Sequence, residues 1–467
     1  MYSMKKSVLV LVLSLASFSA TAKNLYVNNS SASCNDQTTY AANDASNPWC
    51  TLQRAASGAD SWANMNTTEA AKAGDTVLVN AGSYTTAGSG SRLHPAYEPA
   101  NSGNATDGFI TFEAQGNVRL NTTDSAPGSV IGAYLRNYIK WKGFTIDEST
   151  APYRPDTGPI TIFSADNVII ENCVVRASPS AIQDNHTGIR FENATNSVAR
   201  GNVIHGLTGS VPETSTAHNY AGIMLYGNSD ILIENNHVFD SNAGIFIKGN
   251  NNYNITVRYN LIHDTRKGIR TTYTHPTLGH SYIYQNIIRD GVGDSNMGIN
   301  IAEYSNNVTY ANNTIDNFQN GIYFSNSTNQ SNLIIRNNII SNTNNALNAW
   351  SVGDKAFTLD YNVYFNTNEW AFLGAIQTSI TSWKSAVSDD ANADLHDPQF
   401  ENANNNNFRL GSGSLSNAFA IDFLDLDGDS NTTEAVNAGA YTSSSDFIGS
   451  PLSVSIPSSP TNLRVLQ

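Results

Sequence analysis

Apolar and polar residues alternate in short segments throughout the middle of the chain. Asn254-Ile-Thr-Val-Arg258 is one such segment, and its period of two is that of a β-strand. No segment carries the long apolar stripe of period 3.6 that a helical or leucine-rich repeat needs. The pattern therefore predicts an all-β protein built from many short strands.

Two sequence markers recur in step along these segments. An Asn followed two positions later by Val, Ile or Tyr occurs eight times, at spacings of 24 to 34 residues, and a Gly-Ile pair accompanies six of the repeats. Two markers locked at one period in this range indicate stacked coils. We therefore predict a single-stranded right-handed parallel β-helix, a solenoid in which each Asn amide bonds the Asn above and below. The eight are Asn172, Asn202, Asn236, Asn260, Asn286, Asn313, Asn338 and Asn362.

The first residues have the order of a secretory signal peptide. Lys5-Lys6 are followed by an apolar run, and Ala20-Thr21-Ala22 is a small-residue cleavage site, so residues 1–22 are expected to be removed. The apolar run is too short to span a bilayer. We therefore expect a secreted protein, extracellular or periplasmic, with no membrane partner.

The rest of the chain divides into three parts. Residues 23–90 are expected to form an N-terminal cap and first coil, with a short helix covering the open end of the stack. Residues 91–445 are expected to form the β-helix and its C-terminal closing segment, in which Trp383 begins a second short helix. Residues 446–467 have the composition of a linker or tail.

Three Cys residues are present. Cys34 and Cys50 lie close together in the polar N-terminal segment, and export permits their oxidation, so we predict a Cys34–Cys50 disulfide. Cys173 lies beside Asn172 in the repeats and is expected to be a buried, reduced core residue.

The charge balance narrows the choice of partners. The chain has 467 residues, 25 Lys and Arg, and a net charge of −14. Nucleic acid is excluded as a partner, because phosphate binding needs a basic face. An acidic secreted protein can still carry a local basic cleft. We expect a monomer.

The alternation of inward and outward side chains along each strand predicts where the candidate site lies. If the Ile of each Gly-Ile pair points inward, the residues two and four after the Gly point outward. Lys248 and Arg270 are then one coil and two residues apart, and adjacent coils are about 4.8 Å apart. Tyr226 would lie beside Lys248, giving a basic and aromatic strip. The expected substrate-binding residues are Arg190, Glu192, Tyr226, Tyr273 and Tyr323.

This strip suits β-elimination on a uronic-acid polysaccharide. A base removes the C5 proton of a uronate, and a cation beside the carboxylate stabilises the developing charge. Lys248 would be the base, its pKa lowered by Arg270, which would also hold the carboxylate. His218 and Tyr220, on the long segment after Leu207, are the alternative base and acid.

Here the chain resembles the β-helix polysaccharide lyases, which include pectate lyases, chondroitinase B and its alginate-lyase relatives. The resemblance rests on Gly244-Ile-Phe-Ile-Lys248 and Gly268-Ile-Arg270, which match a catalytic Lys followed by an Arg on the next coil. It implies an acidic polysaccharide partner such as alginate, pectate or a glycosaminoglycan. Those enzymes place acidic calcium ligands upstream of the Lys, but residues 241–247 contain no Asp or Glu. Calcium stays open as a cofactor, and without it Arg190 or another cation would neutralise the carboxylate.

Other functions fit the same scaffold. A glycoside hydrolase of the polygalacturonase type needs paired carboxylates, and the strip offers only Glu192, with Glu303 nearby. An epimerase would share the proton-abstraction step. A non-catalytic carbohydrate-binding or adhesive protein would suit the Asn/Ser/Thr-rich surface. The Asp-rich segment 425–429 lacks the length and final Glu of an EF-hand loop and is expected to be a solvated turn.

Overall fold

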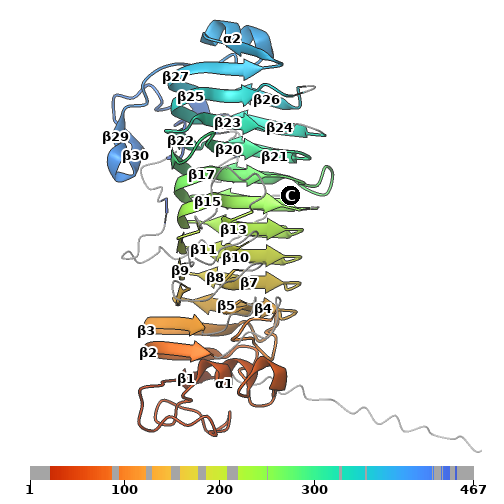
Figure 1. The fold of residues 1–467 in the computed structure, drawn as a ribbon, viewed down its shortest axis with the longest axis vertical. Helices are drawn as coiled ribbons and strands as arrows, with labels where there is room; N and C mark the ends of the chain where they lie inside the picture. The colour runs from red at the N-terminus through yellow and green to blue at the C-terminus, as the bar shows by residue number, and fades with distance from the viewer. Residues whose placement is uncertain are drawn as a thin grey trace, which may run out of the picture.

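The chain winds into a long parallel β-helix, which confirms the predicted fold (Figure 1). The computed structural model describes residues 22–86, 94–122, 129–148, 158–176, 186–207, 219–249, 251–325, 329–352, 355–422, 424, 433, 435–441 and 448–449. The N-terminal coils lie at one end of the stack and helix α2 (Ile380–Val387) at the other. Neither α2 nor the other α-helix of the described chain, α1 (Leu52–Ser57), is long and apolar enough to cross a membrane.

Three parallel sheets run along the stack, and each coil contributes strands to them in the same order. Sheet one comprises β1 (Asn24–Val27), the first halves of β2 (Thr76–Thr86) and β3 (Ile110–Thr122), β5 (Ile139–Lys142), β8 (Val168–Glu171), β11 (Thr195–Arg200), β14 (Ser229–Glu234), β16 (Tyr253–Arg258), β18 (Ser281–Tyr284), β21 (Asn306–Ala311), β24 (Ser331–Arg336) and β26 (Phe357–Asp360).

Sheet two comprises the second halves of β2 and β3, then β6 (Thr145–Asp147), β9 (Val174–Arg176), β12 (Val203–His205), β19 (Ile287–Gly291), β22 (Thr314–Asp316) and the first halves of four long strands. The second halves of those long strands belong to sheet three, with β4 (Ile131–Tyr134), β7 (Ile160–Phe163), β10 (Thr187–Glu192), β13 (Ala221–Tyr226), β20 (Met297–Ile301) and β23 (Asn320–Phe324). The long strands are β15 (His237–Lys248), β17 (Leu261–Thr271), β25 (Ile339–Ala349) and β27 (Val363–Phe372).

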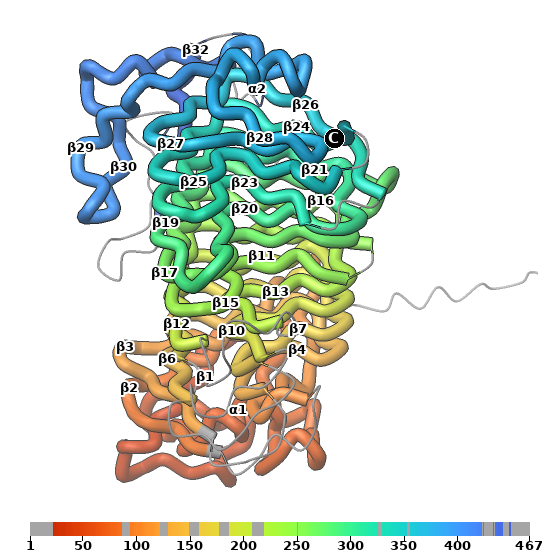
Figure 2. Tube along the Cα trace, turned by 45° about the horizontal axis from the view of Figure 1, so that its top comes forward, coloured from red at the N-terminus to blue at the C-terminus, as the bar shows by residue number. Residues whose placement is uncertain are grey.

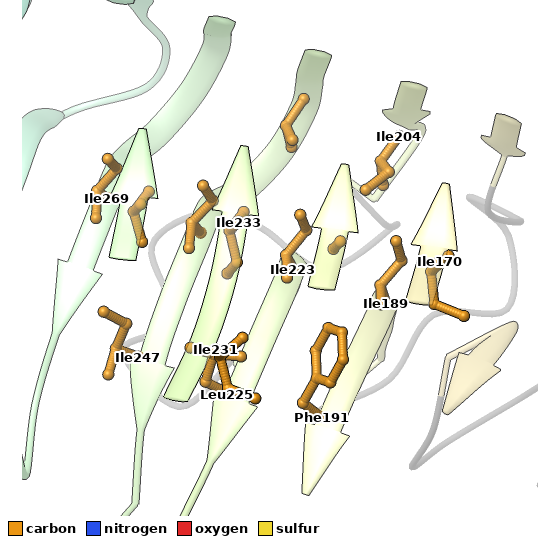
Figure 3. Packing of buried hydrophobic residues seen from close by; sticks show 14 of the residues in the cluster. Ile170, Ile189, Phe191, Ile204, Ile223, Leu225, Ile231, Ile233, Ile247 and Ile269 are labelled. Carbon is orange, nitrogen blue, oxygen red and sulfur yellow. The ribbon is translucent and has the colours of Figure 1, made fainter. Parts of the chain in front are cut away.

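Columns of isoleucine fill the interior. In sheet three, Ile189 pairs with Ile223, and the column continues through Ile245, Ile269 and Ile299, all fully buried. Figure 3 shows Ile189, Ile223 and Ile269 among the side chains of this core. Burying one such side chain contributes roughly 1.5–3 kcal/mol, so the column stabilises every coil to a similar extent.

The Gly before each Ile lies where two coils approach too closely for a side chain. A Cβ built on Gly268 would lie 2.2 Å from the Ile288 Cγ2 atom and 2.5 Å from the Gly298 carbonyl oxygen. This crowding explains the Gly column, because any larger residue would push adjacent coils apart.

Buried Asn side chains bond one coil to the next. From Asn202 to Asn362, each Nδ2 donates to the Oδ1 of the next Asn at 2.9–3.1 Å, and all are fully buried. At the far end Asn362 donates to Asp390, a buried carboxyl that also accepts from Tyr364 and whose pKa burial raises to about 6. The ladder comprises Asn202, Asn236, Asn260, Asn286, Asn313, Asn338 and Asn362.

Asn172 was expected in this ladder, and that expectation is wrong. The ladder position of its coil belongs to Cys173, whose backbone N–H donates to the Asn202 Oδ1 atom at 2.9 Å. Asn172 lies one residue earlier, at a bend with φ of 55°. Because residues 174 and 175 are both Val, a two-residue spacing could not distinguish the two positions.

Both ends of the stack are covered. At the N-terminal end lies α1, whose Thr51 cap accepts from the Arg54 N–H, followed by the 3-10 turn η1 (Trp62–Asn64). The preceding segment is clamped by the Cys34–Cys50 disulfide, as predicted, and Cys173 is buried and free. At the other end Trp383 of α2 is fully buried, with the short strand β28 (Ala375–Gln377) antiparallel to β27.

A closing segment returns along the outside of the stack (Figure 2). It contains β29 (Phe400–Asn402), η2 (Ala403–Asn405), β30 (Asn407–Leu410), β31 (Ala420–Ile421) and β32 (Ala435–Val436). Gly439 donates to the Asn337 carbonyl, Ala440 to the Thr314 hydroxyl, and Gly449 to the Tyr259 carbonyl. The segment thus spans the outer edges of several successive coils.

The ladder gives a test of what sets the coil register. Replacing Asn286 by Ala should lower the free energy of unfolding by at least about 1–3 kcal/mol, because buried amide and carbonyl groups of Asn260, Asn313 and Val257 lose their partners. Asn172→Gly is the control and should leave stability unchanged, since Gly adopts the same φ freely. Equal losses in denaturant unfolding followed by circular dichroism would contradict the assignment.

Candidate functional site

The outer face of sheet three carries most of the candidate residues, in the register expected. Tyr226 pairs with Lys248, and Phe246 pairs with Arg270, so Lys248 and Arg270 lie on a diagonal. Both cations lie over the Phe246 ring, with the Lys248 Nζ atom 5.8 Å and the Arg270 Cζ atom 4.6 Å from its centroid. Tyr226 is 39 % exposed, whereas Phe246 is buried.

Arg190 and Glu192 bind each other on the neighbouring coil. The Glu192 Oε2 atom accepts from the Arg190 Nε and Nη2 atoms at 2.9 and 2.6 Å. The Arg190 side chain is almost fully buried, and its guanidinium lies 6.0 Å from the Tyr226 ring centroid. The two residues therefore form an internally neutral support beneath Tyr226.

The remaining candidates are dispersed. Tyr323 lies in the same row as Arg270, two coils further along. Tyr273 lies at the bend just after sheet three. Tyr220, predicted from the sequence as an alternative catalytic residue, is buried in the main hydrophobic core. His218 and most of the long segment after Leu207 lie outside the described residues.

The structure adds Lys267, which alternation alone did not identify. Ala243, the residue before Gly244, packs with Phe246 on the outer face, so the position before each Gly also faces outward. Lys267 occupies that position on the next coil, pairing with Ala243 as Arg270 pairs with Phe246. Burial, and then the charges of Arg270 and Arg266, lower the pKa of Lys267 to about 7. Because the strand bends at Gly268, a count of outward positions that begins at the Gly misses Lys267.

Arg266, Lys267 and Arg270 form a cationic patch without anionic partners. No carboxylate among the described residues lies within ion-pair distance of them, and the buried Nε atoms of Arg266 and Arg270 have no hydrogen-bond acceptor. On sheet one, by contrast, Arg258 binds Glu234 at 2.8 Å and Arg200 binds Glu171 at 2.9 Å. Burial outweighs the attraction of Glu303 and lowers the pKa of Arg270. Uncompensated, partly buried cations indicate a site for an anion.

A hollow lies beside this patch, at the bend between sheets three and one. Its volume is about 350 Å³, and its lining includes Tyr273, Tyr304, His275, Asn251 and Asn306. The Tyr273 and Tyr304 rings stack with centroids 4.9 Å apart and an interplanar angle of 15°. The size is that of a small-ligand pocket.

The described residues do not form a calcium site. Nowhere in the described ranges do three or more His, Cys, Asp or Glu side chains come together in an arrangement that could hold a metal ion. In the candidate site the nearest carboxylates are Glu192, bound to Arg190, and Glu303. The Asp-rich segment 425–429 lies outside the described residues.

Comparisons with known proteins agree with the architecture. A family model described as "Right handed beta helix region" matches residues 130–286 and 221–386, more than half of the chain together. No curated protein matches the sequence. The solved structure "The complex structure of XylC with xylose" is 12 % identical, with a TM-score of 0.52, covering 91 % of this chain and 99 % of that one. Pectate lyase Pel9A is 11 % identical, with a TM-score of 0.52, covering 90 % and 96 %. The expected resemblance to β-helix polysaccharide enzymes is thus confirmed for the fold.

The lowered pKa of Lys267 gives a stability test. Unfolded Lys titrates near 10.4, so between about pH 7 and 10 folding must release a proton, and below pH 7 it must bury a charge. Lys267→Met should therefore raise the thermal midpoint most at or below pH 7, and the gain should shrink steadily toward pH 10. Differential scanning fluorimetry across this range checks it. A gain independent of pH would show that Lys267 is not desolvated in the folded protein.

Proposed function

This chain belongs to the family of right-handed β-helix proteins, and we propose that it is a polysaccharide lyase that cleaves a uronic-acid polymer by β-elimination. The observation that carries the proposal is the cationic patch of Arg266, Lys267 and Arg270. A protein with a net charge of −14 places three neighbouring, partly buried basic residues on its outer sheet, and none of them has an anionic partner among the described residues. A ligand that brings carboxylates would supply the missing counter-charges.

The patch also provides the two groups that β-elimination needs. Arg270 would hold the uronate carboxylate and stabilise the charge that develops as the C5 proton leaves. A base with a pKa near the working pH takes a proton most efficiently. Lys267 meets this condition, because burial and two arginines lower its pKa to about 7. We assign proton abstraction to Lys267, three residues from Arg270 on β17.

The reaction balances without any further reagent. The electron pair of the C5–H bond forms the C4=C5 double bond, the C4–O bond to the next sugar breaks, and the departing oxygen takes up a proton. Water would donate that proton, because Tyr226, the exposed Tyr of this face, lies two coils and five residues from Lys267. Lys248, paired with Tyr226 and lying over Phe246, would bind the chain beside the reacting uronate and is the alternative base.

The carboxylates of the site argue against hydrolysis. Retaining and inverting hydrolases use a pair of carboxyl groups as acid and as nucleophile or base. Glu192 is held by two hydrogen bonds from Arg190, which leaves Glu303 as the other carboxylate near the patch among the described residues. The Cys34–Cys50 disulfide supports an oxidising compartment, where extracellular polymers are encountered.

Removing the base should abolish elimination. Lys267→Ala should lower turnover of the cleaved polymer by about 100- to 10,000-fold. Arg270→Ala should cause a similar loss through weaker charge stabilisation. The unmutated enzyme should gain activity as pH rises through about 7, because deprotonation of Lys267 creates the base. Activity is read from the ultraviolet absorbance of unsaturated uronates released from alginate, pectate, chondroitin or hyaluronan.

Lys142→Ala is the matched control, since this Lys lies on sheet one and binds Glu113 at 3.1 Å. It should leave activity unchanged. If Lys267→Ala remained active while Lys248→Ala lost activity, proton abstraction would belong to Lys248. If no uronate polymer gave unsaturated product, the lyase proposal would fail, and a carbohydrate-binding role would replace it.

A further inference from the structure

Two tyrosines occupy a bend that other coils fill with smaller residues. At the bend after sheet three every described coil from Leu135 to Tyr304 places one residue in the left-handed region, and Tyr273 and Tyr304 have φ of 51° and 56°. Bulky residues rarely adopt this conformation, although Tyr138, Tyr259 and Tyr361 also adopt it in this chain. The equivalent residues of the preceding coils are Leu135, Ser164, Asn193, Gly227 and Gly249.

The surrounding coils fix the backbone that carries these two rings. The Tyr273 N–H donates to the Glu303 carbonyl at 3.1 Å, which joins the two bends. The Asn306 Nδ2 atom donates to the Tyr304 carbonyl at 2.9 Å, and its Oδ1 atom accepts from Ser331. On this backbone the two stacked rings form a platform, and Tyr304 remains 41 % exposed. A preorganised aromatic surface of this kind suits the apolar C–H face of a sugar ring.

A polar donor stands beside the platform. The His275 Nδ1 atom accepts from the backbone N–H groups of Thr277 and Leu278 at 3.1 and 3.0 Å. Two donors on Nδ1 place the proton of the neutral imidazole on Nε2, and no described residue accepts a hydrogen bond from that atom. His275 lines the hollow, so its Nε2–H is a donor for a ligand hydroxyl or carbonyl.

The charge of the hollow differs from that of the adjoining patch. No Lys, Arg, Asp or Glu is among the described residues that line the hollow. Arg270 lies three residues before Tyr273, a distance of about 10 Å along extended chain. A carboxylate is therefore favoured beside Arg270. A carboxylate beside Tyr304 would meet no positive charge.

We infer that the hollow binds an uncharged pyranose ring next to the uronate held by the cationic patch. That the sugar held by the cationic patch is a uronate rests on the proposed function. The substrate would then be a copolymer in which an uncharged sugar adjoins a uronic acid, rather than a uronate homopolymer. The platform would select the uncharged ring by stacking, and His275 would orient it by a hydrogen bond.

The substitution Tyr304→Asn tests the platform without straining the fold. Asn adopts the left-handed bend readily, so thermal stability should be retained while the ring is lost. We expect the unmutated protein to prefer hyaluronan and unsulfated chondroitin, which alternate a uronate with an uncharged N-acetylhexosamine, over alginate and polygalacturonate. Tyr304→Asn should lower kcat/KM on the two copolymers about tenfold and leave the homopolymers unchanged. Tyr304→Phe keeps the ring and should behave as the unmutated protein.

Calorimetric titration with hyaluronan and polygalacturonate oligosaccharides separates this inference from the lyase proposal. Binding of the copolymer oligosaccharide that weakens about tenfold in Tyr304→Asn alone would support the hollow even if no polymer were cleaved. A preference for homopolymers, or an equal effect of Tyr304→Asn on both classes, would overturn the inference. Cleavage that persists with either result would leave the lyase proposal standing.

Discussion

The buried Asn ladder is the interaction on which the rest of the structure depends. Each ladder amide from Asn202 to Asn338 bonds groups on the coil before it and on the coil after it, so adjacent coils can stack in one register only. A slip by one residue would leave these groups unpaired in the interior and would turn every strand over. Because the register is fixed, residues from separate coils form straight rows on the outside. The cationic patch and the tyrosine platform are parts of such rows.

Two environments then lie side by side at the end of sheet three. On the sheet, Arg266 and Arg270 carry charge that no described carboxylate neutralises by an ion pair. At the bend, Tyr273 and Tyr304 give a rigid surface without charge. Their closeness follows from chain geometry, since the strand that carries Arg270 ends where the bend begins. One polymer could therefore meet both environments with neighbouring sugar units.

The sequence predicted the fold well, because the markers of a β-helix are steric and repeat in every coil. The Gly column, the inward Ile and the disulfide all follow from local rules, and the pairing of Tyr226 with Lys248 follows from counting. Asn172 was misplaced because two successive Val residues make adjacent registers look alike. Lys267 was missed because the bend at Gly268 changes the alternation, and its lowered pKa depends on neighbours from tertiary packing. Tyr273 and Tyr304 are separated by one repeat, but the sequence alone does not show that their rings stack.

The closing segment has a consequence for how the molecule comes apart. A solenoid with contacts only between adjacent coils can fray from either end, one repeat at a time. Here the bonds of Gly439 to Asn337, Ala440 to Thr314 and Gly449 to Tyr259 link the returning chain to coils well inside the stack. The terminal coils cannot open fully until this strap detaches. The C-terminal half should therefore act as one cooperative unit under mechanical load or protease attack, and the strap would be its latch.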